Sequence, residues 1–98
     1  MPNKQYIAGR AFEYQVMATW RSRGYSVIRA SGSKGLYDIV AFRPDRKPEL
    51  IQCKKVSSMA TGDRLFSKFT KTIQPSDYYH QVMAIKVKGQ EPVISLTI

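Results

Sequence analysis

The feature that most constrains this chain is a short polar connection between two β-rich segments. Residues 37–42 and 49–56 are both rich in strand-forming residues, and only the six residues Arg43–Pro48 separate them. Parallel neighbours in a sheet need a crossover of about a dozen residues or more. The connection therefore predicts an antiparallel hairpin.

The pattern around this hairpin predicts an α/β fold. Gly9, Phe12, Val16, Met17 and Trp20 fall within an arc of roughly 140° on a helix, and Gly24 ends that helix. The elements we expect, in chain order, are a helix over 6–23, strands over 25–30, 37–42 and 49–56, a helix over 63–73 capped by Thr61 or Asp63, and strands over 81–88 and 93–98. The order αβββαββ predicts helices packed on a central mixed sheet.

The length predicts a single domain over residues 1–98. A chain of 98 residues buries only about 60–65% of the surface of its unfolded form, so it sustains one small core. One cysteine excludes an internal disulfide and a cysteine-based zinc finger. No run approaches the ~18 apolar residues of a membrane span, and the N-terminal residues do not resemble a signal peptide. We expect a cytoplasmic, nucleoid-associated protein with no membrane contact.

The charge predicts a polyanionic partner. Sixteen Lys and Arg residues face seven acids, which gives a net charge of +9 and a pI near 9.9. These basic residues are spread along the whole chain, so nucleic acid is the favoured partner. A basic protein that binds another protein is the alternative.

Two of the seven acids stand out from their surroundings. Glu13 lies inside the apolar arc of the first helix, where an ionised carboxylate is costly unless it is compensated. Asp38 interrupts a strand, where Asp is a poor strand former. Each could be a buried acid paired with Arg or Lys, or a functional acid. The other five lie beside expected turns or caps and need no function: Asp45, Glu49, Asp63, Asp77 and Glu91.

The second strand of the hairpin favours the functional interpretation. Alternation places Gln52 and Lys54 on one face, and the hairpin lets Asp38 approach them. Carboxylates and an amide oxygen are hard ligands that suit Mg²⁺. A neighbouring lysine can orient a water and offset the charge of a phosphoryl transition state.

At this point the sequence resembles the PD-(D/E)xK nucleases, in which an Asp is followed after about a dozen residues by an acid-x-Lys strand. The flanks, which are residues 9–13, 24–34 and 38–41, resemble the archaeal-type Holliday junction resolvases, a family that also occurs in viruses and phages. The resemblance covers residues 9–56. It implies a restriction-endonuclease-like fold and a homodimer that cleaves four-way DNA junctions with Mg²⁺, for which Mn²⁺ substitutes.

The resemblance also implies roles for individual residues. Glu13, Asp38 and Gln52 would hold the metal, Lys54 would lie beside the attacking water, and the loop Ser33 would be catalytic. The residues expected to contact DNA are Arg10, Arg29, Ser31, Lys34 and Lys55.

The chain departs from the family at one position, because Gln52 stands where the family has Glu. One formal charge is lost, so we expect weaker metal binding. Two rival functions stay open: another nuclease of the superfamily that acts on flaps or repair intermediates, and a catalytically silent DNA-binding module.

The remaining notable side chains receive structural interpretations. We expect Trp20 and Cys53 in the core, Phe66 and Phe69 in the core or at a dimer contact, and His80 at the surface or in packing.

Overall fold

The computed structural model describes residues 4–30, 37–74, 76–90 and 93–97, with the backbone alone for 4–9 and 93–97. The described elements are, in order, α1 (Lys4–Ser22), β1 (Ser26–Arg29), β2 (Ile39–Arg43), β3 (Arg46–Val56), α2 (Met59–Thr72), β4 (His80–Val87) and β5 (Val93–Thr97). This order confirms the predicted αβββαββ arrangement.

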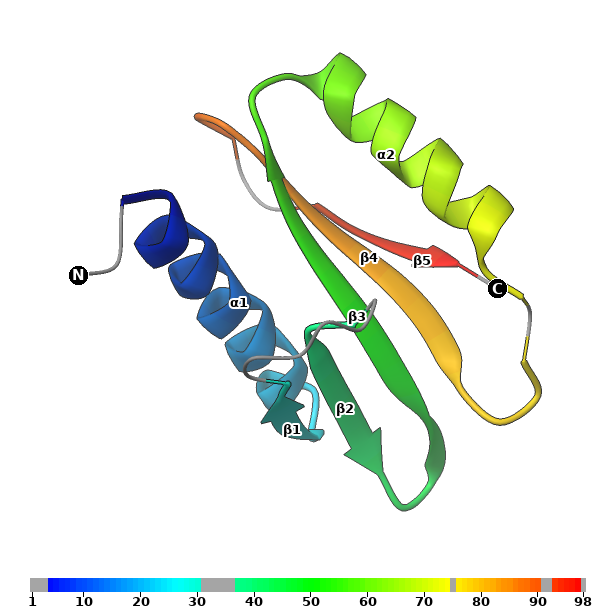
Figure 1. Ribbon diagram of the computed structural model, residues 1–98. Coiled ribbons are helices and arrows are strands. Elements are labelled where there is room, and N and C mark those ends of the chain that lie inside the picture. The colour runs from blue at the N-terminus through cyan, green and yellow to red at the C-terminus, as the bar shows by residue number, and fades with distance from the viewer. Residues whose placement is uncertain (1–3, 31–36, 75, 91–92, 98) are drawn as a thin grey trace.

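The five strands form one mixed sheet in the order β1-β2-β3-β4-β5. The pairs β1–β2, β2–β3 and β4–β5 are antiparallel, and β3 and β4 are parallel with α2 as their crossover. Figure 1 shows α1 beside β1–β3 and α2 along the other part of the sheet. The predicted hairpin is thus the β2–β3 pair.

Each helix covers one face of the sheet and seals a separate apolar cluster. The cluster under α1 contains Phe12, Val16, Met17 and Trp20 of the helix and Ile39, Ala41, Ile51, Val82 and Ala84 of the strands. The cluster under α2 contains Phe69, Met83, Ile85 and Val87, with Phe66 packed against it. Successive residues of β4 therefore enter opposite clusters, as strand alternation requires. The core positions predicted for Trp20, Phe66 and Phe69 are confirmed.

The first helix ends where a glycine reverses the chain. Gly24 has φ 88°, a conformation that side chains with a Cβ rarely adopt. The reversal brings Tyr25 back onto Trp20 in an edge-to-face contact with ring centroids 5.1 Å apart. Over their described residues, neither helix is long and apolar enough to cross a membrane.

Several predicted element starts were wrong. The strand β2 begins at Ile39 rather than residue 37, so Asp38 precedes the strand and does not interrupt it. The strand β3 begins at Arg46 rather than Glu49, because the turn after Arg43 is tight and a register shift opposite Phe42 accommodates Pro48. The helix α2 begins at Met59 rather than Asp63. Its N-cap is Ser58, whose hydroxyl oxygen accepts a hydrogen bond from the Thr61 N–H.

Candidate active site

Asp38 is fixed between two strands by three hydrogen bonds. Its N–H donates to the Ile51 carbonyl oxygen at 2.8 Å, and its own carbonyl oxygen accepts from the Ala30 N–H at 2.8 Å. Its carboxylate Oδ2 accepts from the Cys53 N–H, also at 2.8 Å. The side chain of Asp38 is therefore held against β3.

The register of the hairpin places Asp38 across from Gln52. Ile39 pairs with Ile51, so the next position outward joins residues 38 and 52. Ile51 and Cys53 belong to the cluster under α1, which leaves Gln52 and Lys54 on the opposite face. Gln52 is half-buried and Lys54 is exposed. The chain thus brings an acid, an amide and an amine to one end of the hairpin.

Glu13 approaches Asp38 and Cys53 from α1, which covers the face of the sheet opposite Gln52 and Lys54, and it has a cationic partner. Its Oε1 accepts a hydrogen bond from Arg29 Nε at 2.8 Å, and the two side chains are only 21% and 17% exposed. This is the ion pair that the structural interpretation of a buried acid predicts. Arg29, expected at a DNA phosphate, contacts Glu13 in this structure.

The charges of Asp38 and Glu13 both act on the thiol of Cys53. Burial is the main cause that raises its pKa, and the charges of Asp38 and Glu13 raise it further. Both acids therefore lie within electrostatic range of Cys53. Cys53 also packs against the cluster under α1, which confirms its predicted core position.

The donor types at Asp38, Glu13 and Gln52 suit a hard cation, but the structure places Gln52 on the face of the sheet away from α1 and Glu13. Two carboxylates and one amide oxygen are the ligand types that Mg²⁺ accepts when it keeps several waters. Among the described residues, no group of three or more His, Cys, Asp or Glu side chains could hold a metal. An acid at position 52 would add the third carboxylate, and Gln52 supplies only a neutral oxygen.

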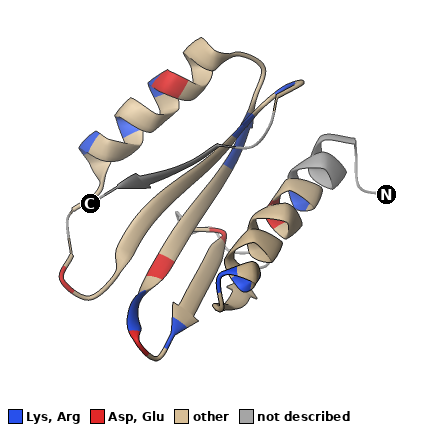
Figure 2. Cartoon of the chain, turned by 180° about the vertical axis from the view of Figure 1, so that it is seen from behind, with Lys and Arg blue, Asp and Glu red and all other residues tan. Residues whose placement is uncertain are grey.

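The residues expected to contact DNA lie in different parts of the structure. Arg10 is exposed on α1, donates to the Tyr14 hydroxyl at 3.3 Å and lies over its ring. Arg10, through this hydrogen bond and its charge, lowers the pKa of Tyr14. Lys55 is exposed on β3. Figure 2 shows further basic residues on α2 and at the turn between β2 and β3. Ser31, Ser33 and Lys34 lie outside the described residues.

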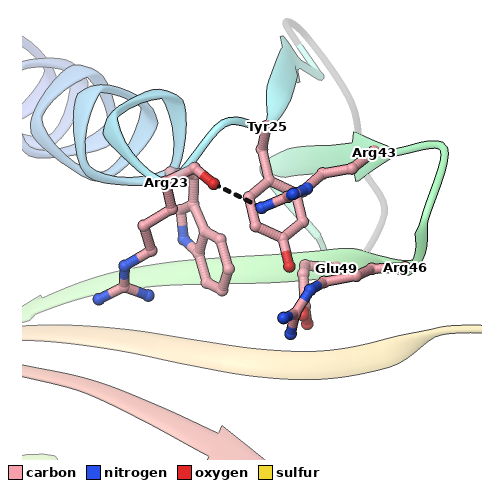
Figure 3. A pocket seen from close by; sticks show the side chains of 6 residues that line it. Arg23, Tyr25, Arg43, Arg46 and Glu49 are labelled. Atoms are coloured by element: carbon pink, nitrogen blue, oxygen red, sulfur yellow. Dashed lines mark hydrogen bonds between the residues drawn. The ribbon is translucent and has the colours of Figure 1, made fainter.

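A second polar site, which sequence reasoning missed, lies at the other end of the hairpin. A pocket of about 320 Å³ opens between the end of α1 and the β2–β3 turn (Figure 3). The residues that line it are Trp20, Arg23, Tyr25, Arg43, Arg46 and Glu49.

The prediction that Glu49 lies beside a turn, where a carboxylate stays solvated, was wrong. It lies inside β3 and is only 5% exposed. Its Oε1 lies 3.0 Å from Nδ1 of His80, the first residue of β4. No local signal marks this burial, because the partner comes from a strand that follows α2.

The comparisons with known proteins bear on the fold. No protein-family model matches the sequence, and no curated protein matches it. Among solved structures, the chain is similar to Hjc, a Holliday junction resolvase from the archaeal hyperthermophile Archaeoglobus fulgidus. The TM-score is 0.60 at 20% sequence identity, and the match covers 89% of this chain and 70% of that chain. The chain therefore has the restriction-endonuclease-like α/β fold that its sequence predicts.

Proposed function

We propose that this protein is an endonuclease that resolves four-way DNA junctions by Mg²⁺-dependent hydrolysis. The observation that carries the proposal is the hydrogen bond between Asp38 and the Cys53 N–H. It holds a carboxylate at the register position across from Gln52, on a fold similar to that of a junction resolvase. Carboxylate, amide and amine at one point of a basic protein fit phosphodiester hydrolysis.

Each side chain of the site has its own role in this proposal. Asp38, Gln52 and Glu13 would hold Mg²⁺, which supplies a polarised phosphoryl oxygen and a more acidic water when it is bound. Lys54 is exposed toward solvent, where its ammonium can orient a water and offset charge on the phosphoryl oxygens. Arg29 must share Glu13 with the cation, because it binds that carboxylate directly.

Gln52 sets the metal requirement of the site. A neutral amide in place of a carboxylate reduces the charge that attracts a divalent cation, so cleavage should need more Mg²⁺. Gln52→Glu should lower the Mg²⁺ or Mn²⁺ concentration for half-maximal cleavage. A titration in which Gln52→Glu and the parent respond alike would remove Gln52 from the metal site.

The deciding experiment uses a synthetic four-way junction, with and without Mg²⁺. Paired nicks on opposite strands that need Mg²⁺, and that Asp38→Asn eliminates, are the expected result. Cuts confined to flaps or plain duplex would point to another nuclease of the superfamily. A shifted but uncut junction, even with Mn²⁺ or with Gln52→Glu, would point to a silent binding module.

Paired cuts also require two sites in one particle. A four-way junction has two-fold symmetry, and a homodimer presents two equivalent active sites to symmetry-related strands. Light scattering should therefore give the mass of a dimer at micromolar concentration. A monomer that still makes paired cuts would contradict this part of the proposal.

A further inference from the structure

The pocket beside the β2–β3 turn contains two buried polar atoms that the described protein leaves without a partner. Nε1 of Trp20 and Oε2 of Glu49 have no hydrogen-bond partner in the structure. Trp20 is 3% exposed and Glu49 is 5% exposed, and both line the pocket. Buried polar atoms are nearly always paired, because an unmade hydrogen bond costs about 1–3 kcal/mol. A ligand could satisfy both atoms.

These two atoms call for a ligand that carries both a donor and an acceptor. The indole N–H of Trp20 can only donate, and an ionised Glu49 oxygen can only accept. His80 already occupies the other carboxylate oxygen of Glu49. The edge of a nucleobase carries both N–H donors and acceptors, so it offers a partner of the right kind to each atom.

The rim of the pocket adds positive charge and flat surfaces. Arg23 lies over the Trp20 ring with its guanidinium carbon 5.0 Å from the centroid, and Arg43 lies over Tyr25 at 5.4 Å. Arg43 is also fixed by the Arg23 carbonyl oxygen and by Asp45. Figure 3 shows Arg46 and Glu49 together on one side of the pocket. Exposed guanidinium groups in this position suit a phosphate.

Neither a simple anion nor a simple cation fits this arrangement. The carboxylate of Glu49 repels an anion that carries no donor, and the three arginines repel a cation. The volume of about 320 Å³ lies near the lower end of the range for small-molecule sites, about 300–1,000 Å³. We propose that this pocket binds a nucleotide, with the base edge on Trp20 and Glu49 and the phosphate at the arginine rim.

The nucleotide site is separate from the proposed nuclease site. Asp38 precedes β2 and Arg43 ends it, so about 16 Å of strand lies between them at about 3.3 Å per residue. The ligand has two possible sources with the same chemistry: a free mononucleotide and an unpaired nucleotide of bound DNA. The inference does not require that the protein cleaves DNA.

The test follows the fluorescence of Trp20, the only tryptophan, with calorimetry as a second readout. Titrations with dCMP, deoxycytidine and deoxyribose 5-phosphate are run in EDTA, so that a metal at Asp38 does not contribute. Saturable binding of dCMP at least about tenfold tighter than either fragment is expected, since one charge-assisted hydrogen bond contributes about that factor. Equal binding of dCMP and deoxyribose 5-phosphate, or no saturable signal, would overturn the proposal.

Two variants test the contact with the base and the contact with the phosphate separately. Glu49→Gln should weaken dCMP about tenfold but should not weaken deoxyribose 5-phosphate, because the carboxylate that repels the phosphate is gone. Arg46→Ala, at the exposed rim, should weaken both phosphate ligands by about threefold and leave deoxycytidine unchanged. Arg64→Ala on α2 is the matched control and should change none of them. If Glu49→Gln does not fold, the Arg46 and Arg64 pair still decides, and identical behaviour of those two variants would overturn the site.

A final comparison identifies the source of the nucleotide. A duplex with a short single-stranded overhang is compared with the blunt duplex of the same length. Tighter binding of the overhang that Arg46→Ala removes and Arg64→Ala retains identifies an unpaired nucleotide of DNA. Equal binding of the two duplexes, with dCMP binding intact, identifies a free mononucleotide.

Discussion

Asp38 has a structural task in this fold, and the proposed function gives the same carboxylate a chemical one. Oδ2 accepts the Cys53 N–H, which would otherwise lack this partner at the point where β2 has not yet begun. In the part of the chain that the structure describes, no hydrogen bond to the other oxygen, Oδ1, is present. An amide side chain can still accept the hydrogen bond through its oxygen, whereas a methyl group cannot.

This division predicts different outcomes for two substitutions. Asp38→Asn should abolish cleavage, keep or raise junction affinity because repulsion of phosphates falls, and change the free energy of unfolding by less than about 1 kcal/mol. Asp38→Ala should abolish cleavage and also destabilise the fold by about 1.5–3 kcal/mol. Urea unfolding and gel-shift titrations measure both effects. Cleavage by Asp38→Asn at the parental rate would refute the metal-site assignment.

The thiol of Cys53, in the same region, makes the free energy of unfolding depend on pH. Its pKa is raised in the folded protein above the ordinary value of 9.0 by burial and by the two nearby acids. Below that value the thiol is protonated in both states, so stability is unaffected. Above it the unfolded chain releases the proton and the folded chain does not, so stability falls as the pH rises.

We therefore expect alkaline destabilisation that depends on this thiol. Between pH 9 and 10.5, the free energy of unfolding should fall by up to about 1.4 kcal/mol per pH unit more in the parent than in Cys53→Ala. Chemical unfolding at several pH values measures the difference. Parallel pH profiles for the two proteins would argue against the buried, protonated thiol.

At the scale of the element, α2 depends on its cap. Ser58 caps the helix through the Thr61 N–H, and its hydroxyl also lies 3.0 Å from the Thr61 hydroxyl. Ser58→Ala should lower the free energy of unfolding by about 1 kcal/mol. Asp63→Ala is the control, since Asp63 lies inside the helix and is exposed. If Asp63→Ala were the more damaging change, the helix would begin at the later position.

The start of α2 shows where local sequence patterns mislead. Asp63 and Thr61 are both good capping residues, and Gly62 beside them resembles a break. In the structure Gly62 is buried within α2, where a Cβ would lie 3.4 Å from Ile85. The close approach of the helix to the sheet explains this glycine, and only the tertiary structure reveals it.

For the whole molecule, local signals predicted the order of the elements and the position of Asp38 across from Gln52. They did not predict the burial of Glu49. The hairpin between β2 and β3 follows from the length of its turn, and it places Asp38 across from Gln52. Glu49 contacts His80 from β4 instead, and it shares a pocket with Trp20 of α1 and with Tyr25, which follows that helix. These contacts join parts of the chain that no sequence period connects.

The charge of the whole molecule predicts its response to salt. With a net charge of +9 and basic residues on both helices and the β2–β3 turn (Figure 2), binding to DNA should depend on released counterions. About 6–10 phosphate contacts would reduce affinity ~10³–10⁵-fold between 50 and 200 mM salt. Fluorescence anisotropy with a labelled junction measures the slope. A nearly flat response would refute the nucleic-acid partner.

The parallel pairing of β3 with β4 has a consequence for the order in which the sheet assembles. The strands β1 to β3 pair along short connections, but β4 begins only after α2, at His80, while β3 ends at Val56. Closing the longer segment costs more entropy, and non-local pairing slows folding. Pulse-labelled hydrogen exchange should therefore protect the amides of the β2–β3 hairpin before those of β4, and the reverse order would contradict this. The half of the sheet that carries Asp38 and Gln52 would then form first and provide the edge on which β4 docks.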